Sequence, residues 1–447
     1  MRPVENGDSV ESSAESQPKK MTRGHSMAIL GSSGLAALSS LGITVVVKRF
    51  LEGESLTEFL LFWSLLFALY GVVVGIQQEA TRAVGTARRD GKTGARIAPV
   101  GALVGLVVGG LTLATSPLWA PAQIPLSGFS GVLLLSAGVA LYAMHMTLYG
   151  ASAGQESWYL FASVSGFDAI WRIVAICAVG LVSAHLIGLE AAAVSPVLLW
   201  LLMVLLLPEA RRVFSSRADV SSGRLLYNYT LSMGSSTANA VLMMGLPLLL
   251  NVSIDSNDPL QQVILAVLIL AISITRSPIM IPLQAFQGVA VSAFLKQQNH
   301  PLRAFAKPAG ALLGVGLVGA AAAYVLGPWL FGLLYPPKPS EVEAYAQVVT
   351  SPVLALLVFA SAFLALLVLS GSLVIALNMH RSYVAGWVLA AAVACVVAVS
   401  PLPLLTRTLL ALYAGPTLGL LVHVVAMVWR ARSVSSSGNA EMENIDK

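Results

Sequence analysis

Two arginines lie within long apolar stretches of this sequence, where a charged side chain is costly and is usually either paired or functional. Arg172 follows Asp168 by four residues. On a helix this spacing brings both side chains onto one face, where they can neutralise each other. The two residues therefore form either a structural ion pair within a helix bundle or part of a cavity wall on which Arg172 meets an anionic head group.

Arg276 has no acidic residue within two helical turns on either side. Its partner must come from another helix, with Asp168 as one candidate, or from water or a substrate. A guanidinium group can bind phosphate through two parallel hydrogen bonds, which makes arginine well suited to this anion. Arg276 is therefore our first candidate for a cavity-lining residue that binds an anionic substrate.

The residues that follow Arg276 also favour a polar cavity. Pro278 and Pro282 each lack a backbone N–H, so we expect this helix to kink and to leave carbonyl groups that prefer contact with water. Gln284 and Gln287 continue the polar face of the same helix. Both glutamines are therefore included among the predicted substrate-binding residues.

Glu79 and Arg82 stand where the second apolar stretch ends. One interpretation is that they are ordinary polar anchors at the membrane surface, a common role for charged residues beside a span. The alternative is a gate, in which Glu79 pairs with an arginine from the other half of the chain when the cavity faces outward. The sequence leaves both interpretations open.

The remaining polar residues show no catalytic or metal-binding pattern. The sequence contains no P-loop, no His-Glu-x-x-His motif and no nucleophile elbow. His145 and His423 are each isolated in an apolar helix, so we expect hydrogen bonds to neighbours rather than a proton relay. The two cysteines, Cys177 and Cys395, lie in apolar stretches and suggest no metal or redox site. We predict a protein that is not an enzyme and has no cofactor, with any coupling cation undetermined.

The elements that must position these residues are transmembrane helices. Of the 447 residues, 57% are hydrophobic and 11% are charged, whereas a soluble domain carries about a quarter charged residues. Apolar stretches of about 20 residues recur along the chain, each long enough to cross a hydrocarbon core of roughly 30 Å. The predicted spans are 25–47, 56–76, 97–118, 126–149, 158–183, 188–207, 226–252, 261–290, 308–334, 350–377, 383–401 and 404–429. The sequence therefore predicts an all-α membrane protein with about 12 transmembrane helices.

The positions of the basic residues indicate the orientation of these spans. With the N-terminus inside, the inner segments hold 20 of the 26 lysines and arginines. The outer loops hold only four, which are Lys48, Arg49, Lys338 and Arg407. Because lysine and arginine accumulate on the cytosolic side of membrane proteins, we predict a multi-pass protein of the plasma membrane with both termini in the cytosol.

A charged, serine-rich inner segment from Pro208 to Arg224 divides the spans into six and six. This arrangement is typical of transporters built from two parallel six-helix halves. We predict a disordered cytosolic tail at 1–24, an N-lobe at 25–208, a cytosolic linker at 209–225, a C-lobe at 226–430 and a second disordered tail at 431–447. The composition of both tails favours disorder.

Four segments carry a resemblance to a known group of transporters. They are Leu56–Trp63 and Gln78–Arg82 at the two ends of the second span, the stretch Arg276–Gly288, and Ala376–Tyr383. Together with the twelve-span layout, they resemble the multidrug/oligosaccharidyl-lipid/polysaccharide (MOP) exporter superfamily. Within that superfamily the sequence is most similar to polysaccharide-biosynthesis flippases of the Wzx type.

The resemblance implies two six-helix lobes around a central cavity that opens alternately to each side of the membrane. It also implies a polyprenyl-(pyro)phosphate-linked glycan as cargo, with Arg276 and Arg172 at the positions that meet the pyrophosphate. We accordingly expect this glycan and membrane lipid as partners, together with glycosyltransferases or a polymerase of the same pathway. We expect no nucleic acid and a monomeric protein.

Three alternatives remain open at this point. A drug or small-metabolite exporter of the same superfamily would need a cavity carboxylate, and only Asp168 is available. A major-facilitator transporter would carry its signature between the second and third spans, but the loop at 85–94 has a different residue order. A membrane glycosyltransferase would need catalytic carboxylates in an outer loop. The acids of the predicted outer loops show no evident partner residues; they are Asp255, Asp258, Glu341 and Glu343.

Overall fold

The computed structural model describes residues 22–445 except 256–257, 296–300 and 378; the side chains of 23, 281–282, 284–295, 301 and 431–445 are also outside the description. In the described residues the only β-type pairing is an isolated bridge between Arg96 and Arg217. The helices are α1 (Arg23–Phe50), α2 (Gly53–Asp90), α3 (Ile97–Gln123), α4 (Gly128–Gly154), α5 (Trp158–Val182), α6 (Leu186–Val194), η1 (Ser195–Leu198), α7 (Leu199–Leu206), α8 (Pro208–Phe214), α9 (Ser222–Met244), α10 (Leu246–Val252), α11 (Pro259–Leu295), α12 (Pro301–Leu334), η2 (Pro339–Glu341), α13 (Val342–Val348), α14 (Ser351–Ala376), α15 (His380–Ala398) and α16 (Leu404–Ile445).

Every predicted span coincides with a helix or a set of consecutive helices. Among the described residues, 11 helical segments are long and apolar enough to cross a membrane, and the bent pair α9 and α10 brings the number to 12. The sixth span consists of α6, η1 and α7 in succession. The prediction of an all-α protein with about 12 transmembrane helices is confirmed.

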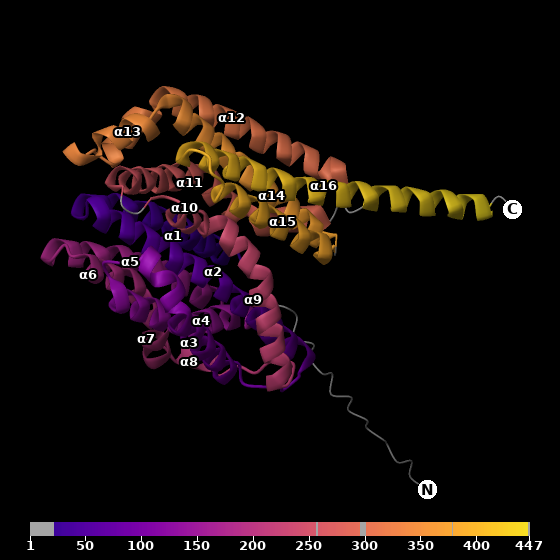
Figure 1. Ribbon diagram of the computed structural model, residues 1–447. Coiled ribbons are helices and arrows are strands. Elements are labelled where there is room, and N and C mark those ends of the chain that lie inside the picture. The colour runs from indigo at the N-terminus through magenta and orange to yellow at the C-terminus, as the bar shows by residue number, and fades with distance from the viewer. Residues whose placement is uncertain (1–21, 256–257, 296–300, 378, 446–447) are drawn as a thin grey trace, which may run out of the picture.

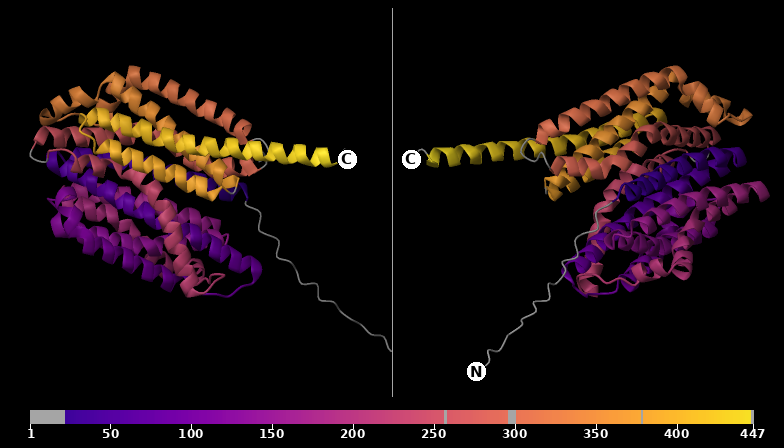
Figure 2. Two further views of the ribbon diagram at one scale, coloured as in Figure 1. Left: turned by 45° about the vertical axis from the view of Figure 1, so that its right-hand side comes forward. Right: turned by 180° about the vertical axis from the view of Figure 1, so that it is seen from behind.

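The helices form two lobes (Figure 1). The helices from α1 to α8 make up the N-lobe and those from α11 to α16 the C-lobe, and α9 and α10 run between them. Figure 2 shows that the start of α1 and the end of α16 lie at the same end of the molecule. We call this the terminal end and the opposite end the distal end. Viewed in Figures 1 and 2, the helices of the two lobes diverge towards the terminal end.

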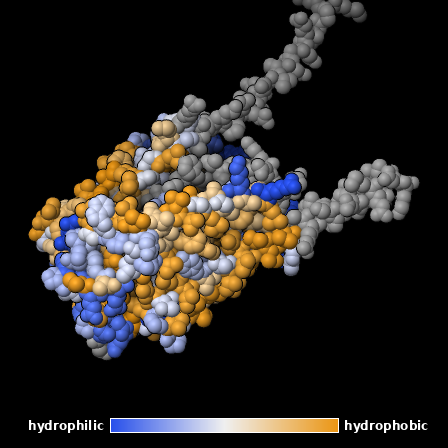
Figure 3. Space-filling view, turned by 90° about the horizontal axis from the view of Figure 1, so that it is seen from above, coloured by the Kyte–Doolittle hydropathy of each residue, from blue (hydrophilic) through white to orange (hydrophobic). Residues whose placement is uncertain are grey.

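The surface of the C-lobe matches a membrane environment. In the view of Figure 3 hydrophobic side chains cover most of this face, and hydrophilic side chains gather towards its two ends. Val318, Val325 and Trp329 on α12 are all exposed. Such a continuous apolar surface is expected where lipid tails are the solvent. The chain is therefore a multi-pass membrane protein.

Helix α11 continues as one helix past Pro278 and Pro282. The sharpest bend among the described membrane helices lies instead in the seventh span. The angle between α9 and α10 is 65°. Two residues account for this bend. A Cβ atom on Gly245 would lie 2.5 Å from the Val241 carbonyl oxygen, and Pro247 has no N–H to continue the helical hydrogen bonds.

Candidate functional site

A cavity of about 430 Å³ lies between the lobes; we call it the central cavity. Its walls come from α1, α2 and α5 of the N-lobe and from α9, α10 and α11. The only charged side chain among its described lining residues is Arg276, and none of them is acidic. Hydroxyl groups are numerous in the lining; they belong to Ser33, Ser40, Thr44, Ser64, Ser165, Ser273 and Ser277.

Helix α1 gives this cavity one of its polar walls. Ser33, Ala37, Ser40 and Thr44 follow one another at intervals of three or four residues, so they share one helix face. Their small side chains leave room beside the helix. Trp63, Met243, Met244 and Met280 supply apolar surface elsewhere in the cavity. The cavity thus combines hydroxyl groups, one positive charge and apolar walls, a mixture usual for ligand sites.

The half-buried Arg276 has an interhelical partner that is a backbone group. Its Nη1 donates a hydrogen bond of 2.7 Å to the carbonyl oxygen of Met243 on α9. In a regular helix that carbonyl would accept from the N–H of residue 247, but residue 247 is a proline. Arg276 therefore satisfies a carbonyl that the bend in the seventh span leaves without its helical donor.

This single bond leaves Arg276 without a neutralising carboxylate in the described part of the chain. The predicted alternative, an ion pair with Asp168, does not form, because Asp168 is paired with Arg172. A guanidinium has five N–H donors, of which the bond to Met243 uses one. The others can bind an anion in the central cavity.

Arg172 lies in the interior of the N-lobe with 4% of its surface exposed. Its Nη2 donates to Asp168 Oδ2 at 2.7 Å, and its Nη1 donates to the carbonyl oxygen of Ala193 at 2.7 Å. The guanidinium also stands over the ring of Phe67, 5.2 Å from its centroid. The predicted ion pair therefore forms, and Arg172 is absent from the described lining of the central cavity.

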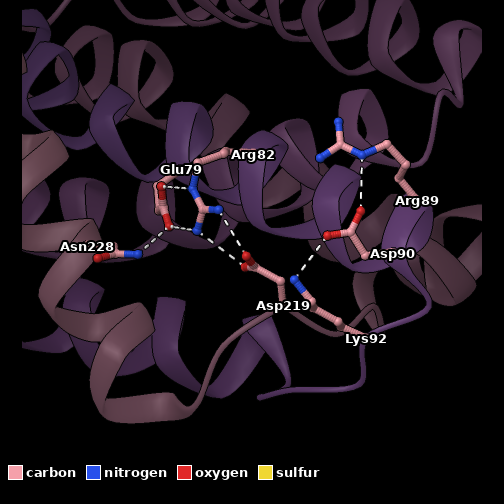
Figure 4. Close-up of polar contacts among 7 residues, drawn as sticks. All are labelled: Glu79, Arg82, Arg89, Asp90, Lys92, Asp219 and Asn228. Atoms are coloured by element: carbon pink, nitrogen blue, oxygen red, sulfur yellow. Dashed lines mark hydrogen bonds and ion pairs between the residues drawn. The ribbon is translucent and has the colours of Figure 1, made fainter.

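Four residues form a cluster near the terminal end (Figure 4), which we call the terminal-end cluster. Arg82 holds both oxygens of Glu79, through Nε at 2.8 Å and Nη2 at 2.6 Å. It also holds both oxygens of Asp219, at 3.0 and 3.2 Å. Asn228 on α9 donates to Glu79 Oε1 at 2.8 Å. Glu79 thus pairs with an arginine of its own helix, while its contact with the second half of the chain is made by an asparagine.

The segment between α8 and α9 is fixed to the N-lobe next to this cluster. Gly94 N–H donates to the Ala218 carbonyl at 2.7 Å, and Ala218 N–H donates to the Ala95 carbonyl at 2.8 Å. Ala95 N–H in turn donates to the Val220 carbonyl at 2.8 Å. Backbone hydrogen bonds therefore hold the predicted cytosolic linker against the loop between α2 and α3.

At the distal end a buried ion pair joins the lobes. Lys48 Nζ at the end of α1 lies 2.7 and 2.6 Å from the two carboxylate oxygens of Glu341 in η2. The two side chains are 1% and 2% exposed. The hydroxyls of Thr44 and Tyr335 share a further bond of 2.8 Å between the lobes. We call Lys48 and Glu341 the distal ion pair.

Tyr345 makes a further buried contact beside the distal ion pair. Tyr345 donates its hydroxyl proton to the Tyr335 carbonyl at 2.7 Å, and burial raises the pKa of Tyr345 above its ordinary value, which keeps this donor protonated. Glu341, which had no evident partner in the sequence, is thus part of an interlobe contact. The sequence offered no signal for it, because Lys48 and Glu341 are 293 positions apart.

The other predicted residues have the following places. Gln284 and Gln287 belong to α11, but their side chains lie outside the described residues. His423 bonds with Ser370 Oγ at 2.8 Å, as expected for a histidine satisfied by its neighbours. The His145 ring stacks on Tyr142, and its Nδ1 has no hydrogen-bond partner among the described residues.

Comparison with known proteins gives two results at the level of sequence. No protein-family model matches the chain. The chain is 32% identical over 432 residues to uncharacterized protein Rv1510 of Mycobacterium tuberculosis, covering 96% of this chain and 97% of that protein. It is also 32% identical over 402 residues to uncharacterized protein Rv3630 of the same organism, covering 88% and 90% of the two chains.

Solved structures identify the fold. An inward-facing multidrug resistance MATE family transporter of the MOP superfamily superposes with a TM-score of 0.63 at 14% identity, covering 92% of this chain and 98% of that one. A MOP superfamily transporter from Pyrococcus furiosus gives a TM-score of 0.62 at 12% identity, covering 92% and 96%. The fold is therefore that of the MATE transporters in the MOP superfamily.

Proposed function

We propose that this chain, which belongs to the same protein family as Rv1510 and Rv3630 of Mycobacterium tuberculosis, moves an anionic, lipid-linked substrate across a membrane by alternating access. The substrate class is a saccharide attached to a polyprenyl phosphate or pyrophosphate. Flipping would carry its head group from the inner to the outer leaflet for cell-envelope polysaccharide synthesis, while the lipid chain stays in the bilayer.

The observation that carries this proposal is the polarity of the central cavity. One guanidinium without a carboxylate partner among the described residues stands in a lining rich in hydroxyl groups. Arginine suits a phosphate or pyrophosphate, and hydroxyl groups suit the hydroxyls of a sugar. The MOP fold adds support, since the related structures are transporters.

The alternative is export of small molecules, as in the multidrug resistance proteins that share the fold. A cavity for cationic drugs would require an acidic group to balance their charge. The described lining contains none. For the Pyrococcus furiosus transporter, reverse polarity of the binding pocket suggests a different function. We extend the same reasoning to this chain and favour an anionic substrate.

The test is a flipping assay with the full-length protein in proteoliposomes. A fluorescent disaccharide linked to a prenyl pyrophosphate would be supplied, and its exposure in each leaflet followed with an impermeant quencher. We expect Arg276→Gln to reduce the flipping rate at least 10-fold, because the neutral amide cannot hold the anion. Arg89→Gln changes an exposed arginine outside the cavity and should keep the native rate. Native flipping by a correctly folded Arg276→Gln protein would overturn the proposal.

A further inference from the structure

We infer that the N-lobe carries a second anion site, a groove at the terminal end that binds the phosphate group of an anionic membrane lipid. This groove, which we call the α8 groove, has a volume of about 560 Å³. Its lining residues are Arg88, Gln155, Arg212, Val213 and Ser216. None of them belongs to the described lining of the central cavity. The inference therefore goes beyond the proposed function and does not depend on it.

The end of the sixth span places the α8 groove at the membrane surface. Leu205, Leu206 and Leu207 are exposed, as expected of apolar residues that contact lipid tails. Helix α8 begins directly after them, at Pro208. Arg211 on α8 donates to the Leu205 carbonyl at 2.9 Å, which holds α8 against the end of α7. The groove therefore lies close to the depth of the lipid head groups.

The ends of α2 and α4 form the other wall of the α8 groove. Arg88 on α2 donates from Nη1 to the Gln155 carbonyl at 2.7 Å, and its Nη2 lies 2.6 Å from Glu156 Oε2. Glu156 has a φ of 56°, a left-handed conformation that residues other than glycine rarely adopt. The ion pair with Arg88 holds this residue in place. This wall is therefore already fixed in the absence of a ligand.

The charges in the α8 groove favour an anion. Glu156 neutralises Arg88. The side chain of Arg212 is exposed and has neither an ion pair nor a hydrogen bond among the described residues. One positive charge in the groove therefore remains without a partner in the described part of the chain. A guanidinium can bind two oxygens of one phosphate at the same time, which suits Arg212 to this ligand.

Ser216 and Gln155 add uncharged polar groups to the same groove. The Gln155 side-chain amide donates to Ser216 Oγ at 3.1 Å. Because the Ser216 oxygen accepts this bond, its own hydroxyl proton can be donated to an anion. The backbone N–H of Ser216 donates to the Val213 carbonyl at 3.1 Å, which fixes the serine at the end of α8. A phosphate in the groove would thus find a guanidinium and a hydroxyl donor.

The position of the α8 groove favours a lipid over a free phosphate. The exposed leucines that precede α8 would contact the acyl chains of a lipid whose phosphate binds Arg212. The terminal end is predicted to be cytosolic, and the inner leaflet contains anionic lipids that attract lysine and arginine. A zwitterionic lipid carries its own cation next to the phosphate, so it should bind less tightly than an anionic lipid.

Lipid titration of the purified full-length protein in detergent tests the inference, with native mass spectrometry counting the bound lipids. We expect Arg212→Gln to weaken the tightest phosphatidylglycerol binding step by at least about 5-fold, because the charge-assisted bonds are lost. Ser216→Ala should weaken it by about 3-fold through the loss of one hydroxyl donor. Arg89→Gln removes an equal charge from an exposed arginine outside the groove and should bind like the native protein.

Three results would overturn the inference. Equal weakening by Arg212→Gln and Arg89→Gln would indicate a positive surface without a specific site. Binding of soluble glycerol phosphate as tight as that of phosphatidylglycerol would make free phosphate the ligand. Equal binding of phosphatidylcholine would remove the role of net negative charge.

The same titration separates this inference from the proposed function. Arg276→Gln, which should abolish most flipping, should keep the native affinity for phosphatidylglycerol, because Arg276 lies outside the α8 groove. Loss of the tightest binding step in Arg276→Gln would instead place the lipid in the central cavity and overturn the α8 groove as its site. The titration uses no transport substrate, so its outcome does not depend on the flipping assay.

Discussion

The distal ion pair allows a quantitative prediction about the contact between the lobes. Lys48 and Glu341 are almost fully buried and bonded through both carboxylate oxygens at 2.6 and 2.7 Å. Replacing Lys48 by methionine removes the charge and keeps most of the apolar stem. Among the described residues, the carboxylate of Glu341 then keeps only the backbone N–H of Lys338 as a donor, at 2.9 Å. Removing one partner of a buried pair costs about 3–5 kcal/mol, and we expect Lys48→Met to lose stability of this size.

The reverse substitution and the double variant complete the cycle. Glu341→Met should cost a similar amount, because it leaves an ammonium group buried without a partner. The double variant should regain most of the loss and fall within about 1–2 kcal/mol of the native protein, because well-packed apolar residues can replace a buried ion pair. Denaturant titration in a mild detergent would measure the free energy of unfolding of all four proteins.

A matched control comes from an exposed pair. Lys92 and Asp90 lie 3.0 Å apart, with side chains 55% and 32% exposed. Lys92→Met should change stability by less than about 1 kcal/mol, because surface ion pairs contribute little. Small or additive effects at Lys48 and Glu341 would refute the burial of this pair between the lobes.

Three further expectations follow from the remaining contacts. Arg82→Met leaves Glu79 and Asp219 without their shared cation, so a protease should cut the 215–221 segment several-fold faster. The control Arg89→Met should be cleaved at the rate of the native protein. Gly75→Leu should separate α9 from α2 and reduce the folded yield, while Gly110→Leu, with nothing within 4 Å of an added Cβ, should not; equal yields would contradict the close helix contact. Arg172→Met should destabilise by about 3–5 kcal/mol through the unpaired Asp168, and Asp168→Asn in the same protein should recover part of that loss; no recovery in a thermal unfolding series would count against the pair.

The sequence predicted the helices well because the hydrophobic length of a span is a local property. The pairing of Arg172 with Asp168 could be predicted from the sequence equally well, since residues four apart on a helix are neighbours. Both features depend on residues that lie close together in the chain. The structure adds that this pair is buried inside the N-lobe.

The contacts between the lobes could not be predicted in the same way. Lys48 counted as a loop residue in the sequence, and only the fold brings it to Glu341. The partner of Arg276 is a backbone carbonyl, which no residue type reveals. A signal did exist in the seventh span, where Gly245 and Pro247 interrupt an apolar stretch. Such interruptions point to binding regions in transporters, but the carbonyl and its donor become apparent only when α9 and α11 are seen together.

We propose above all that an anionic lipid-linked saccharide is the cargo of this protein. The most direct measurement is to deplete the protein in its native cell and to quantify lipid-linked saccharides by mass spectrometry, with an impermeant probe separating the pools of the two leaflets. We predict that one polyprenyl-linked glycan accumulates on the inner leaflet, and that native protein, but not the Arg276→Gln variant, restores its distribution. Unchanged pools of every lipid-linked saccharide after depletion would contradict the claim.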